Sequence, residues 1–266
     1  MMNSPASIID KKAVALSFGR AAGSYDAHAS LQRQSALDLA ERVTQNPDSG
    51  RILDLGCGTG FARQVLAARY PQAEITGLDI ALPMLQFSRH KYGNTAQSLI
   101  CGDAESLPLA ADSFDLVFSN LAIQWCSHYQ QLFGEIRRIL KPGGSALLST
   151  FGPATLQELR QAWSTVDDHV HVNEFHSSAE LAAALASHSF RDVTIETQTC
   201  VRHYRDVAAL ARELKAIGAH NINYGKAAGL TGKNSLRRLQ ESFQVGAEPG
   251  RGVAVTRELL SLSQYR

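Results

Sequence analysis

A short apolar run that ends in an acid and three alternate glycines is the stretch best suited to chemistry. It reads Arg51-Ile-Leu-Asp-Leu-Gly-Cys-Gly-Thr-Gly60, and a helical pattern begins at Phe61. Because glycine has no Cβ, the backbone at Gly56, Gly58 and Gly60 can take positive φ angles and let a ligand lie against the peptide units. The stretch therefore predicts a strand, a tight ligand-binding turn and the N-terminus of a helix.

The spacing of the glycines and the acid before them indicate which ligand binds. A dinucleotide-binding turn has the pattern G-x-G-x-x-G, whereas here the third glycine comes one residue early. Asp54 precedes the first glycine, and an acid there disfavours pyrophosphate and favours a ligand with an ammonium or sulfonium centre. The pattern D-x-G-x-G-x-G resembles the first motif of class I S-adenosylmethionine-dependent methyltransferases. Taken alone, the loop is also compatible with an ordinary strand-to-helix turn.

Two more acids follow predicted strands further along the chain. Asp79 follows the strand at 74–78, about twenty residues past the last glycine, where a carboxylate can accept both hydroxyls of a ribose. It is also suited to cap the next helix. Asp103 follows the strand at 98–101 and can accept a hydrogen bond from an adenine amino group. Because parallel strands end at one edge of a sheet, these acids and Asp54 are expected to line one ligand site.

Strands and helices alternate from Arg51 onward, and this alternation predicts a fold of the α/β class. We expect a Rossmann-like, mostly parallel seven-stranded sheet of the class I methyltransferase kind, with right-handed crossovers and helices on both faces. The predicted strands are residues 51–55, 74–78, 98–101, 114–119, 145–151, 192–202 and 253–263.

The chain divides into four predicted regions. An N-terminal helical lid covers residues 1–45, and an S-adenosylmethionine-binding core covers residues 46–204. The stretch between the last two strands is too long for a turn. Residues 205–250 are therefore predicted to form a helical cap, inserted before the final core strand at 251–266.

The lid carries aromatic and ionisable side chains in a helix that contains two glycines. Gly19 and Gly23 lower helix stability, so this stretch is predicted to be hinged. Phe18, Tyr25 and His28 would then face the ligand. The alternative is that the two aromatic residues only pack the helix onto the core.

Composition limits the classes of function. The chain has 266 residues, of which 44% are hydrophobic, so it can bury a sizeable core. Its formal charge of +1 gives no overall bias towards nucleic acid or an anionic membrane, and neither is expected as a partner. No apolar run is long enough to span a bilayer, and four scattered cysteines fit a reducing compartment, so a cytoplasmic protein is predicted. The spacing of His169, His171 and His176 fits no helical pair of metal ligands, so no metal is expected.

Several stretches together carry a closer resemblance that covers most of the chain. They are Phe18–His28, Asp54–Gly60, Gly102–Pro108, Asn120–Trp125 and Leu214–Asn221. Together they resemble the malonyl-acyl-carrier-protein O-methyltransferases of biotin biosynthesis. The glycine loop and the Gly-Asp pair belong to the whole methyltransferase superfamily, whereas the last two stretches are specific to this family.

One departure from that family lies in the final strand. Family members usually show a Thr-Tyr-Glu run there, and this chain has Val255-Thr-Arg-Glu258. The part that the last strand plays in the substrate pocket is therefore left open.

The resemblance implies methyl transfer from S-adenosylmethionine to the free carboxylate of a malonyl thioester, carried by acyl-carrier protein or coenzyme A. This is an early step towards the pimeloyl chain of biotin. A carboxylate is already ionised near neutral pH, so the nucleophile needs no general base. No Ser-His-Asp or paired-carboxylate constellation stands out in the sequence, and none is required.

Site residues are assigned on the same basis. Tyr25 and His28 are expected to be catalytic, and Trp125, Arg202 and His203 to contact the substrate. Contacts to S-adenosylmethionine are expected from Asp54, Gly56, Cys57, Gly58, Gly60, Asp79, Ile80, Met84, Asp103, Ala104, Asn120 and Leu121.

The predicted cap is rich in basic residues, among them Arg212, Lys215 and Lys226. As a group they favour an acidic partner such as acyl-carrier protein, although most charged helix faces are simply solvated.

Alternative functions also stay open. A methyltransferase that acts on another small molecule, such as a quinone ring carbon, would need a general base and an apolar pocket, whereas the cap sequence is polar. A non-catalytic S-adenosylmethionine-binding protein is also compatible, because the motifs report binding and not turnover. A nicotinamide-dependent dehydrogenase is disfavoured by the glycine spacing.

Overall fold

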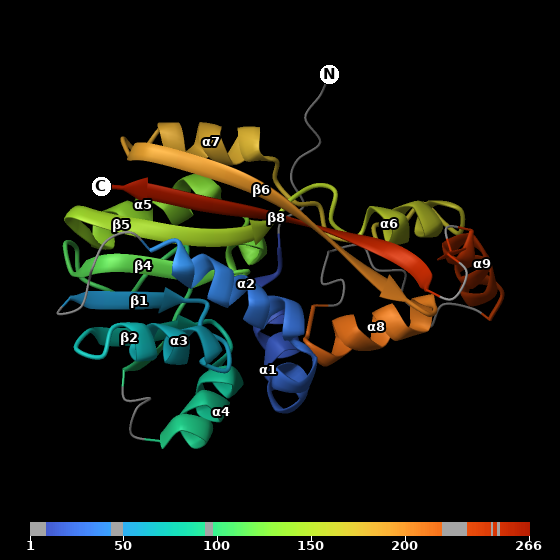
Figure 1. The fold of residues 1–266 in the computed structure, drawn as a ribbon, viewed down its shortest axis with the longest axis horizontal. Helices are drawn as coiled ribbons and strands as arrows, with labels where there is room; N and C mark the ends of the chain where they lie inside the picture. The colour runs from blue at the N-terminus through green and yellow to red at the C-terminus, as the bar shows by residue number, and fades with distance from the viewer. Residues whose placement is uncertain (1–8, 44–49, 94–97, 220–232, 246, 249–250) are drawn as a thin grey trace.

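The centre of the protein is one large twisted sheet (Figure 1). The computed structural model describes residues 9–43, 50–93, 98–219, 233–245, 247–248 and 251–266. The strand order is β3-β2-β1-β4-β5-β8-β6, and the short β7 pairs with β8. The strands are β1 (Arg51–Leu55), β2 (Glu74–Asp79), β3 (Leu99–Cys101), β4 (Phe114–Asn120), β5 (Leu140–Phe151), β6 (Arg191–Tyr204), β7 (Ala247–Glu248) and β8 (Gly252–Tyr265).

Five of these strands, β1 to β5, are parallel, and β8 runs antiparallel to both β5 and β6. This arrangement confirms the predicted mostly parallel α/β sheet of the class I methyltransferase kind. The seven predicted strands form its continuous path, and β7 is an additional two-residue strand among the described residues.

Side-chain alternation along β1 explains how helices cover both faces of the sheet. Leu53 and Leu55 pack with α5 (Tyr129–Ile139) and α7 (Ser178–Ala186). Ile52, which points the other way, packs with helices on the opposite face. Those helices are α2 (Ser30–Glu41) and α3 (Phe61–Arg69). Because Asp54 shares the parity of Ile52, the strand period places its side chain on the α2 and α3 face.

The N-terminal lid is built around α1 (Lys11–His28), which is one continuous helix. Asp10 caps it, because its side chain accepts hydrogen bonds from the backbone N–H groups of the next turn. The helix is unbroken at Gly19 and Gly23, and the hinge expected there stays a prediction. Gly19 lies against Pro83 of α4 (Leu82–Tyr92), where an added Cβ would come within 3.0 Å of the ring. This glycine permits close helix packing.

The cap lies beyond the end of β5, where β6 and β8 continue as a two-stranded extension (Figure 1). Its helices are α6 (Gln157–Ser164), α8 (Val207–Ala216) and α9 (Lys233–Gln244). An apolar cluster that includes Leu159, Leu210, Phe243 and Val255 joins them to the strands. The cap predicted over 205–250 is thus joined by α6 from the range assigned to the core.

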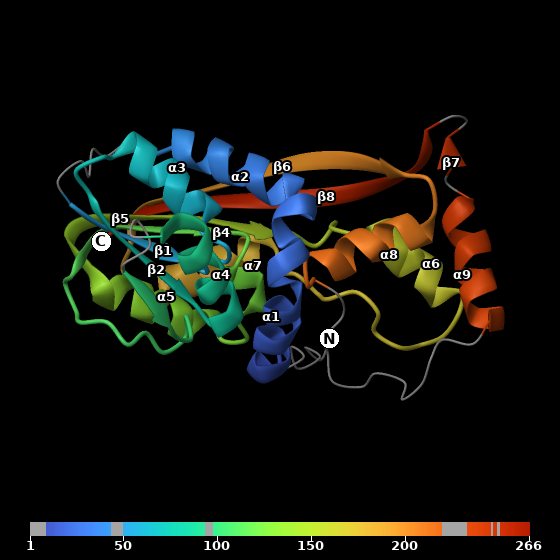
Figure 2. The ribbon, with the colours of Figure 1, turned by 90° about the horizontal axis from the view of Figure 1, so that it is seen from below.

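Helix α1 lies between the sheet and the cap helices (Figure 2). Two hydrogen bonds attach it to the cap, from Ser17 Oγ to the Gly218 carbonyl at 2.8 Å and from Ser24 Oγ to the Ala216 carbonyl at 2.7 Å. The boundary predicted between residues 45 and 46 lies outside the described residues, as do Lys226 and the end of the Leu214–Asn221 stretch. Among the described helices, none is both long and apolar enough to cross a bilayer.

Candidate active site

The glycine loop has the conformation that its sequence predicts. Gly56, Gly58 and Gly60 have φ angles of 76°, 52° and 89°, a region that L-residues with side chains rarely adopt. A Cβ on Gly56 would come within 2.2 Å of the Ala122 side chain, and one on Gly60 within 2.4 Å of Ser88 Oγ. Gly58 has open space above it. The loop therefore packs closely at both ends and presents bare backbone at its centre.

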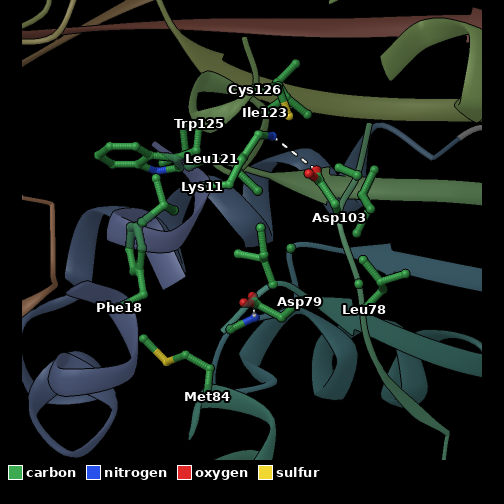
Figure 3. Close-up of a pocket in the computed structure, with 18 of the residues that line it drawn as sticks. Lys11, Phe18, Leu78, Asp79, Met84, Asp103, Leu121, Ile123, Trp125 and Cys126 are labelled. Atoms are coloured by element: carbon green, nitrogen blue, oxygen red, sulfur yellow. Dashed lines mark hydrogen bonds and ion pairs between the residues drawn. The ribbon is translucent and has the colours of Figure 1, made fainter. Parts of the chain in front are cut away.

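A cleft with about 730 Å³ of empty space, open solvent included, lies over this loop at the carboxyl edge of the sheet (Figure 3). Nine of the twelve residues predicted to contact S-adenosylmethionine line it: Gly56, Gly58, Asp79, Ile80, Met84, Asp103, Ala104, Asn120 and Leu121. Asp54 and Cys57 line a smaller neighbouring cavity on the α2 side of the loop. Gly60 lines neither of these two cavities, because it begins α3 and packs against α4.

Asp79 holds both the loop and the backbone that leads into α4, whose N-cap residue is Ala81, so the predicted capping role of Asp79 is wrong. Its Oδ2 accepts a hydrogen bond from the Gly58 N–H at 2.8 Å, and its Oδ1 accepts one from the Ala81 N–H at 2.8 Å. Burial raises the pKa of this carboxyl, and the two backbone donors oppose the shift. Each carboxylate oxygen has a second lone pair, so the group can also accept hydroxyl donors from a ligand in the cleft.

Asp103 lies at the far end of the cleft and is paired with the lid. Lys11 Nζ is 3.1 Å from Asp103 Oδ1 and 2.8 Å from Glu105 Oε2. Figure 3 shows the Lys11 side chain reaching Asp103. Sequence reasoning did not select Lys11, because a single lysine in an N-terminal helix carries no motif.

Asp54 lies in a different environment from the other two acids. It is 1% exposed and sits on the opposite side of β1 from the apolar α5 face. The pKa of its carboxyl is raised to about 7, chiefly by burial; the buried Arg63 of α3 opposes the shift and the neighbouring Asp79 contributes to it. Asp54 is therefore a buried acid beside the glycine loop and does not line the larger cleft.

Three aromatic side chains and Leu121 form a wall between the cleft and a second, larger cavity. Phe18 and Trp125 make an edge-to-face contact with ring centroids 5.3 Å apart, and Tyr25 lies 6.5 Å from Phe18. All four residues line both cavities. Burial raises the pKa of Tyr25, and nearby Asp79 adds to the shift, so its phenol stays protonated and can donate a hydrogen bond.

The second cavity, which we call the chamber, has about 1310 Å³ of empty space, open solvent included. Its walls come from α1, β5, α6, α8, α9, β8 and the segment at 171–175, and most of the side chains are apolar. The polar groups among them include Gln124, His171, Glu213 and Arg257. The cap sequence is polar, but the chamber under it is mostly apolar, because Arg205, Arg212 and Lys215 are exposed while Leu, Val and Trp side chains line the chamber.

Three predicted site residues lie outside these cavities. His28 is exposed at the end of α1, where its Nδ1 lies 3.0 Å from the Ser24 carbonyl. Arg202 pairs with Glu213 at 3.3 Å and donates to Ser30 Oγ at 2.8 Å. His203 is exposed on β6. Alternation along β6 carries these last two side chains to opposite faces of the strand, and none of the three lines the cleft or the chamber.

The three clustered histidines do not converge. His171 Nε2 lies 2.7 Å from Asp167 Oδ1, and its ring stacks on Trp163 with centroids 3.6 Å apart. His176 packs against Tyr129. Within the described part of the chain, no group of three or more His, Cys, Asp and Glu side chains is arranged to hold a metal ion.

Arg257 is a second residue that sequence reasoning did not place in the site. It belongs to the run Val255-Thr-Arg-Glu258, where the last strand departs from the family pattern. That departure was the one feature of the sequence that could have pointed to Arg257. The register of β8 carries Arg257 past the end of β5 and into the chamber wall.

Known proteins resemble this chain at two levels. The methyltransferase domain family matches residues 53–148. Among solved structures, the YcgJ protein of Bacillus subtilis has a TM-score of 0.61 at 17% identity and covers 88% of this chain and 98% of its own. A Haemonchus contortus phosphoethanolamine N-methyltransferase solved with S-adenosyl-L-methionine has a TM-score of 0.58 at 20% identity. The match covers 88% of this chain and 52% of that chain. These structures support the fold.

Sequence relatives are more specific. A malonyl-acyl-carrier-protein O-methyltransferase of Methylococcus capsulatus is 43% identical, with 93% of this chain and 90% of the relative covered. One from Gallionella capsiferriformans is 41% identical, with 89% and 84% covered. The biotin biosynthesis bifunctional protein BioHC of Cellvibrio japonicus is 44% identical, and this chain spans only 48% of its length. By this similarity, the chain belongs to the family of malonyl-acyl-carrier-protein O-methyltransferases.

Proposed function

We propose that this protein transfers a methyl group from S-adenosylmethionine to the free carboxylate of a malonyl thioester, early in biotin synthesis. The observation that carries the proposal is the pair of cavities that share the wall of Phe18, Tyr25, Leu121 and Trp125. One is suited to the donor and the other to the acyl substrate, and the names of the relatives favour a malonyl group on acyl-carrier protein.

The cleft residues suit the donor in shape and charge. Bare backbone at Gly58 permits close contact with the donor. The free lone pairs of Asp79 can accept hydrogen bonds from the two ribose hydroxyls, and Asp103 can accept one from the adenine amino group. The aromatic wall offers ring faces or edges to a sulfonium, and cations favour such faces. Asp54 adds negative charge behind the loop whenever it is ionised.

The reaction needs no proton transfer. Bound S-adenosylmethionine supplies a methyl group whose bond to sulfur breaks, leaving the electron pair on sulfur, as a bond to the carboxylate oxygen forms. The substrate carboxylate is ionised at neutral pH, so the protein has to orient it and to exclude the water that would stabilise the anion. Well-oriented reactants can gain roughly 7–11 kcal/mol from proximity.

Tyr25 is the predicted catalytic residue that lies at the junction of the cavities. Its protonated phenol can hydrogen-bond one carboxylate oxygen and leave the other free to attack. Trp125 closes the same wall. His28 and His203 are placed too far out for such a role without rearrangement, because they are exposed and line neither cavity.

A mass-spectrometric assay with malonyl, succinyl and glutaryl thioesters tests the proposal. Each acyl group is offered on acyl-carrier protein and on coenzyme A, with S-adenosylmethionine present. The expected result is a methyl ester of the malonyl group together with an equal amount of S-adenosylhomocysteine. Donor binding without any methyl ester would identify a non-catalytic binder instead.

The apolar chamber also favours a second candidate, methyl transfer to a ring carbon of a quinone. That reaction requires a general base beside the substrate. His171, paired with Asp167, is the one histidine among the described chamber residues. Turnover of a quinone in the same assay, with none of any malonyl thioester, would establish this candidate over the carboxylate reaction.

A further inference from the structure

Arg257 on β8 is a buried cation that lines the chamber. The residue is 3% exposed. Among the described residues it makes two long hydrogen bonds, at 3.5 Å from Nη1 to the Thr256 carbonyl and at 3.5 Å from Nη2 to the Tyr204 hydroxyl. A guanidinium has five N–H donors, so most of its hydrogen-bonding capacity is not used by these contacts.

The acids closest to Arg257 in sequence and space are committed to other partners. Glu213 accepts a 2.8 Å hydrogen bond from the Tyr204 hydroxyl and pairs with Arg202. Glu158 accepts from the Thr256 N–H and hydroxyl at 3.0 and 2.6 Å. Glu258 accepts from the Ala154 N–H at 2.8 Å. No ion pair to Arg257 is found among the described residues, so its charge lacks a contacting counter-charge there.

Such an arrangement is costly unless an anion completes it. A buried charge without a partner loses hydration that the protein does not replace, and burial accordingly lowers the pKa of Arg257. Arg257 is also the one lysine or arginine among the described residues that line the chamber. Glu213, the one acid among those residues, already pairs with Arg202, and most of the other walls are apolar, so the guanidinium leaves a position in the chamber that favours a negatively charged group.

We infer that Arg257 is the receptor for the acyl carboxylate of the substrate in the chamber. This inference rests on the proposed function, because it assigns a residue to the substrate of that reaction. A guanidinium N–H that donates to one carboxylate oxygen leaves the second oxygen available to the donor methyl group. Arg257 is a binding residue in this account, and it does not take or give a proton.

Methylation changes this interaction in a predictable direction. The carboxylate loses its charge as the ester forms, so the charge-assisted hydrogen bond to Arg257 weakens along the reaction. Arg257 therefore stabilises the bound substrate more than the transition state, and its removal should raise KM while leaving kcat within a few-fold. For the same reason the neutral ester should bind more weakly than the acid, which favours product release.

The test compares two ligands that differ only in this charge. Malonyl-acyl-carrier protein and the same carrier with the malonyl carboxylate methylated are titrated into the protein by calorimetry, with S-adenosylhomocysteine bound to prevent turnover. Contacts to the carrier are common to both ligands and cancel in the ratio of Kd values. In the unaltered protein the acid should bind about 10- to 100-fold more tightly than the ester, the range of a charge-assisted hydrogen bond.

The same pair of titrations is repeated with three variants. Arg257→Gln should bring the ratio close to one, and Arg257→Lys should restore part of it. Arg191→Gln removes an exposed arginine at the start of β6, far from the chamber in the strand, and should keep the full ratio of the two Kd values. Unchanged affinity for S-adenosylhomocysteine shows that each variant is folded, because Arg257 does not line the donor cleft.

The outcomes separate the inference from the proposed function. If the unaltered protein methylates the malonyl group but Arg257→Gln keeps the preference for the acid, only the assignment of Arg257 is overturned. The same holds if the unaltered protein binds acid and ester equally. If no malonyl thioester is methylated by the unaltered protein, the proposed function fails and the assignment with it.

Discussion

The three acids at the carboxyl ends of β1, β2 and β3 have distinct surroundings. Asp54 is enclosed beside Arg63, Asp79 is held by backbone donors, and Asp103 is paired with a lysine of the lid. Their positions in the sequence predict a shared edge of the sheet but not these partners. The alternation of side chains along β1 places Asp54 on the face away from the cleft, and contacts with distant segments determine the partners of Asp79 and Asp103.

Asp54 should make donor binding depend on pH. Its pKa is raised to about 7, so the carboxyl is neutral below that pH and negative above it. The donor is positively charged at sulfur and at its amino group, so its affinity should rise between pH 6 and pH 8. Calorimetry at the two pH values, in buffers of different ionisation enthalpy, should also detect proton release on binding near pH 7.

The Asp54→Asn variant is the control for this effect. Arg63 on α3 and Asp79 on β2 act electrostatically on the same carboxyl, and both remain in the variant. Its donor affinity should therefore change much less between pH 6 and pH 8. A variant that keeps the full pH dependence would assign the effect to another group.

Asp79 should be essential for donor binding. Asp79→Ala removes the acceptor for the ribose hydroxyls and also releases the Gly58 and Ala81 N–H groups. Loss of two charge-assisted hydrogen bonds predicts a Kd for S-adenosylmethionine raised by about 100-fold or more. Glu74→Ala, at the opposite and exposed end of β2, is the matched control. Equal affinity of Asp79→Ala and the unaltered protein would refute the ribose assignment.

Residues were predictable from the sequence where a motif fixed the backbone. The glycines, Asp79 and Asp103 follow from strand-end spacing, and Tyr25 and Trp125 from aromatic residues in the matching stretches. Lys11 and Arg257 have no such spacing, because their roles depend on helices and strands far away in the chain.

At the scale of elements, α1 is the feature that sequence reasoning described least well. Two glycines favoured a hinge, yet the helix is continuous across both, because contacts at its two ends can outweigh the low helix propensity of glycine. Lys11 ties the start of α1 to Asp103, and Asp26 ties its end to Thr59 at 2.6 Å and Lys91 at 2.7 Å. Packing against Pro83 then accounts for Gly19.

Gly23→Ala tests whether α1 acts as a rigid element. A Cβ at Gly23 would meet nothing within 4 Å, so the change should stabilise the helix by about 1 kcal/mol. The melting temperature should rise by about 2–4 °C, and kcat should stay the same. Calorimetry and steady-state kinetics measure the two quantities. A fall in kcat alongside higher stability would restore the hinge, because added helix stiffness would then slow a required motion.

Regular elements were predictable where the pattern was long and periodic. The bounds predicted for β1 match the structure, the helix expected from Phe61 is α3, and the strand predicted at 192–202 lies within β6. The inclusion of α6 in the cap was not predictable, because its apolar face is equally suited to the sheet or to other helices.

At the scale of the whole molecule, α1 and the cap helices together enclose the chamber, and the cap offers a basic outer face. Arg212 and Lys215 are exposed on α8, while Glu213 between them lines the chamber. We propose that this division suits a substrate presented by an acidic carrier protein, because a basic outer face would attract the carrier while the chamber would receive the acyl group.

Charge reversal on α8 tests this docking surface. In the Arg212→Glu, Lys215→Glu double variant, KM for malonyl-acyl-carrier protein should rise at least tenfold, because like charges would then face each other. KM for malonyl coenzyme A should change far less. Arg191→Glu, at the other end of β6, is the matched control and should leave both constants unchanged. Equal increases for both substrates in the double variant would place the carrier elsewhere.

The central claim is that donor and carboxylate meet at the aromatic wall between two cavities. A crystal structure with S-adenosylhomocysteine and a malonyl thioester measures this most directly. We expect the ribose hydroxyls on Asp79, the adenine beside Asp103 and the malonyl carboxylate on the chamber side of Tyr25 and Trp125, in line with the sulfur atom. A donor analogue bound away from Asp79, or a malonyl group outside the chamber, would contradict the account.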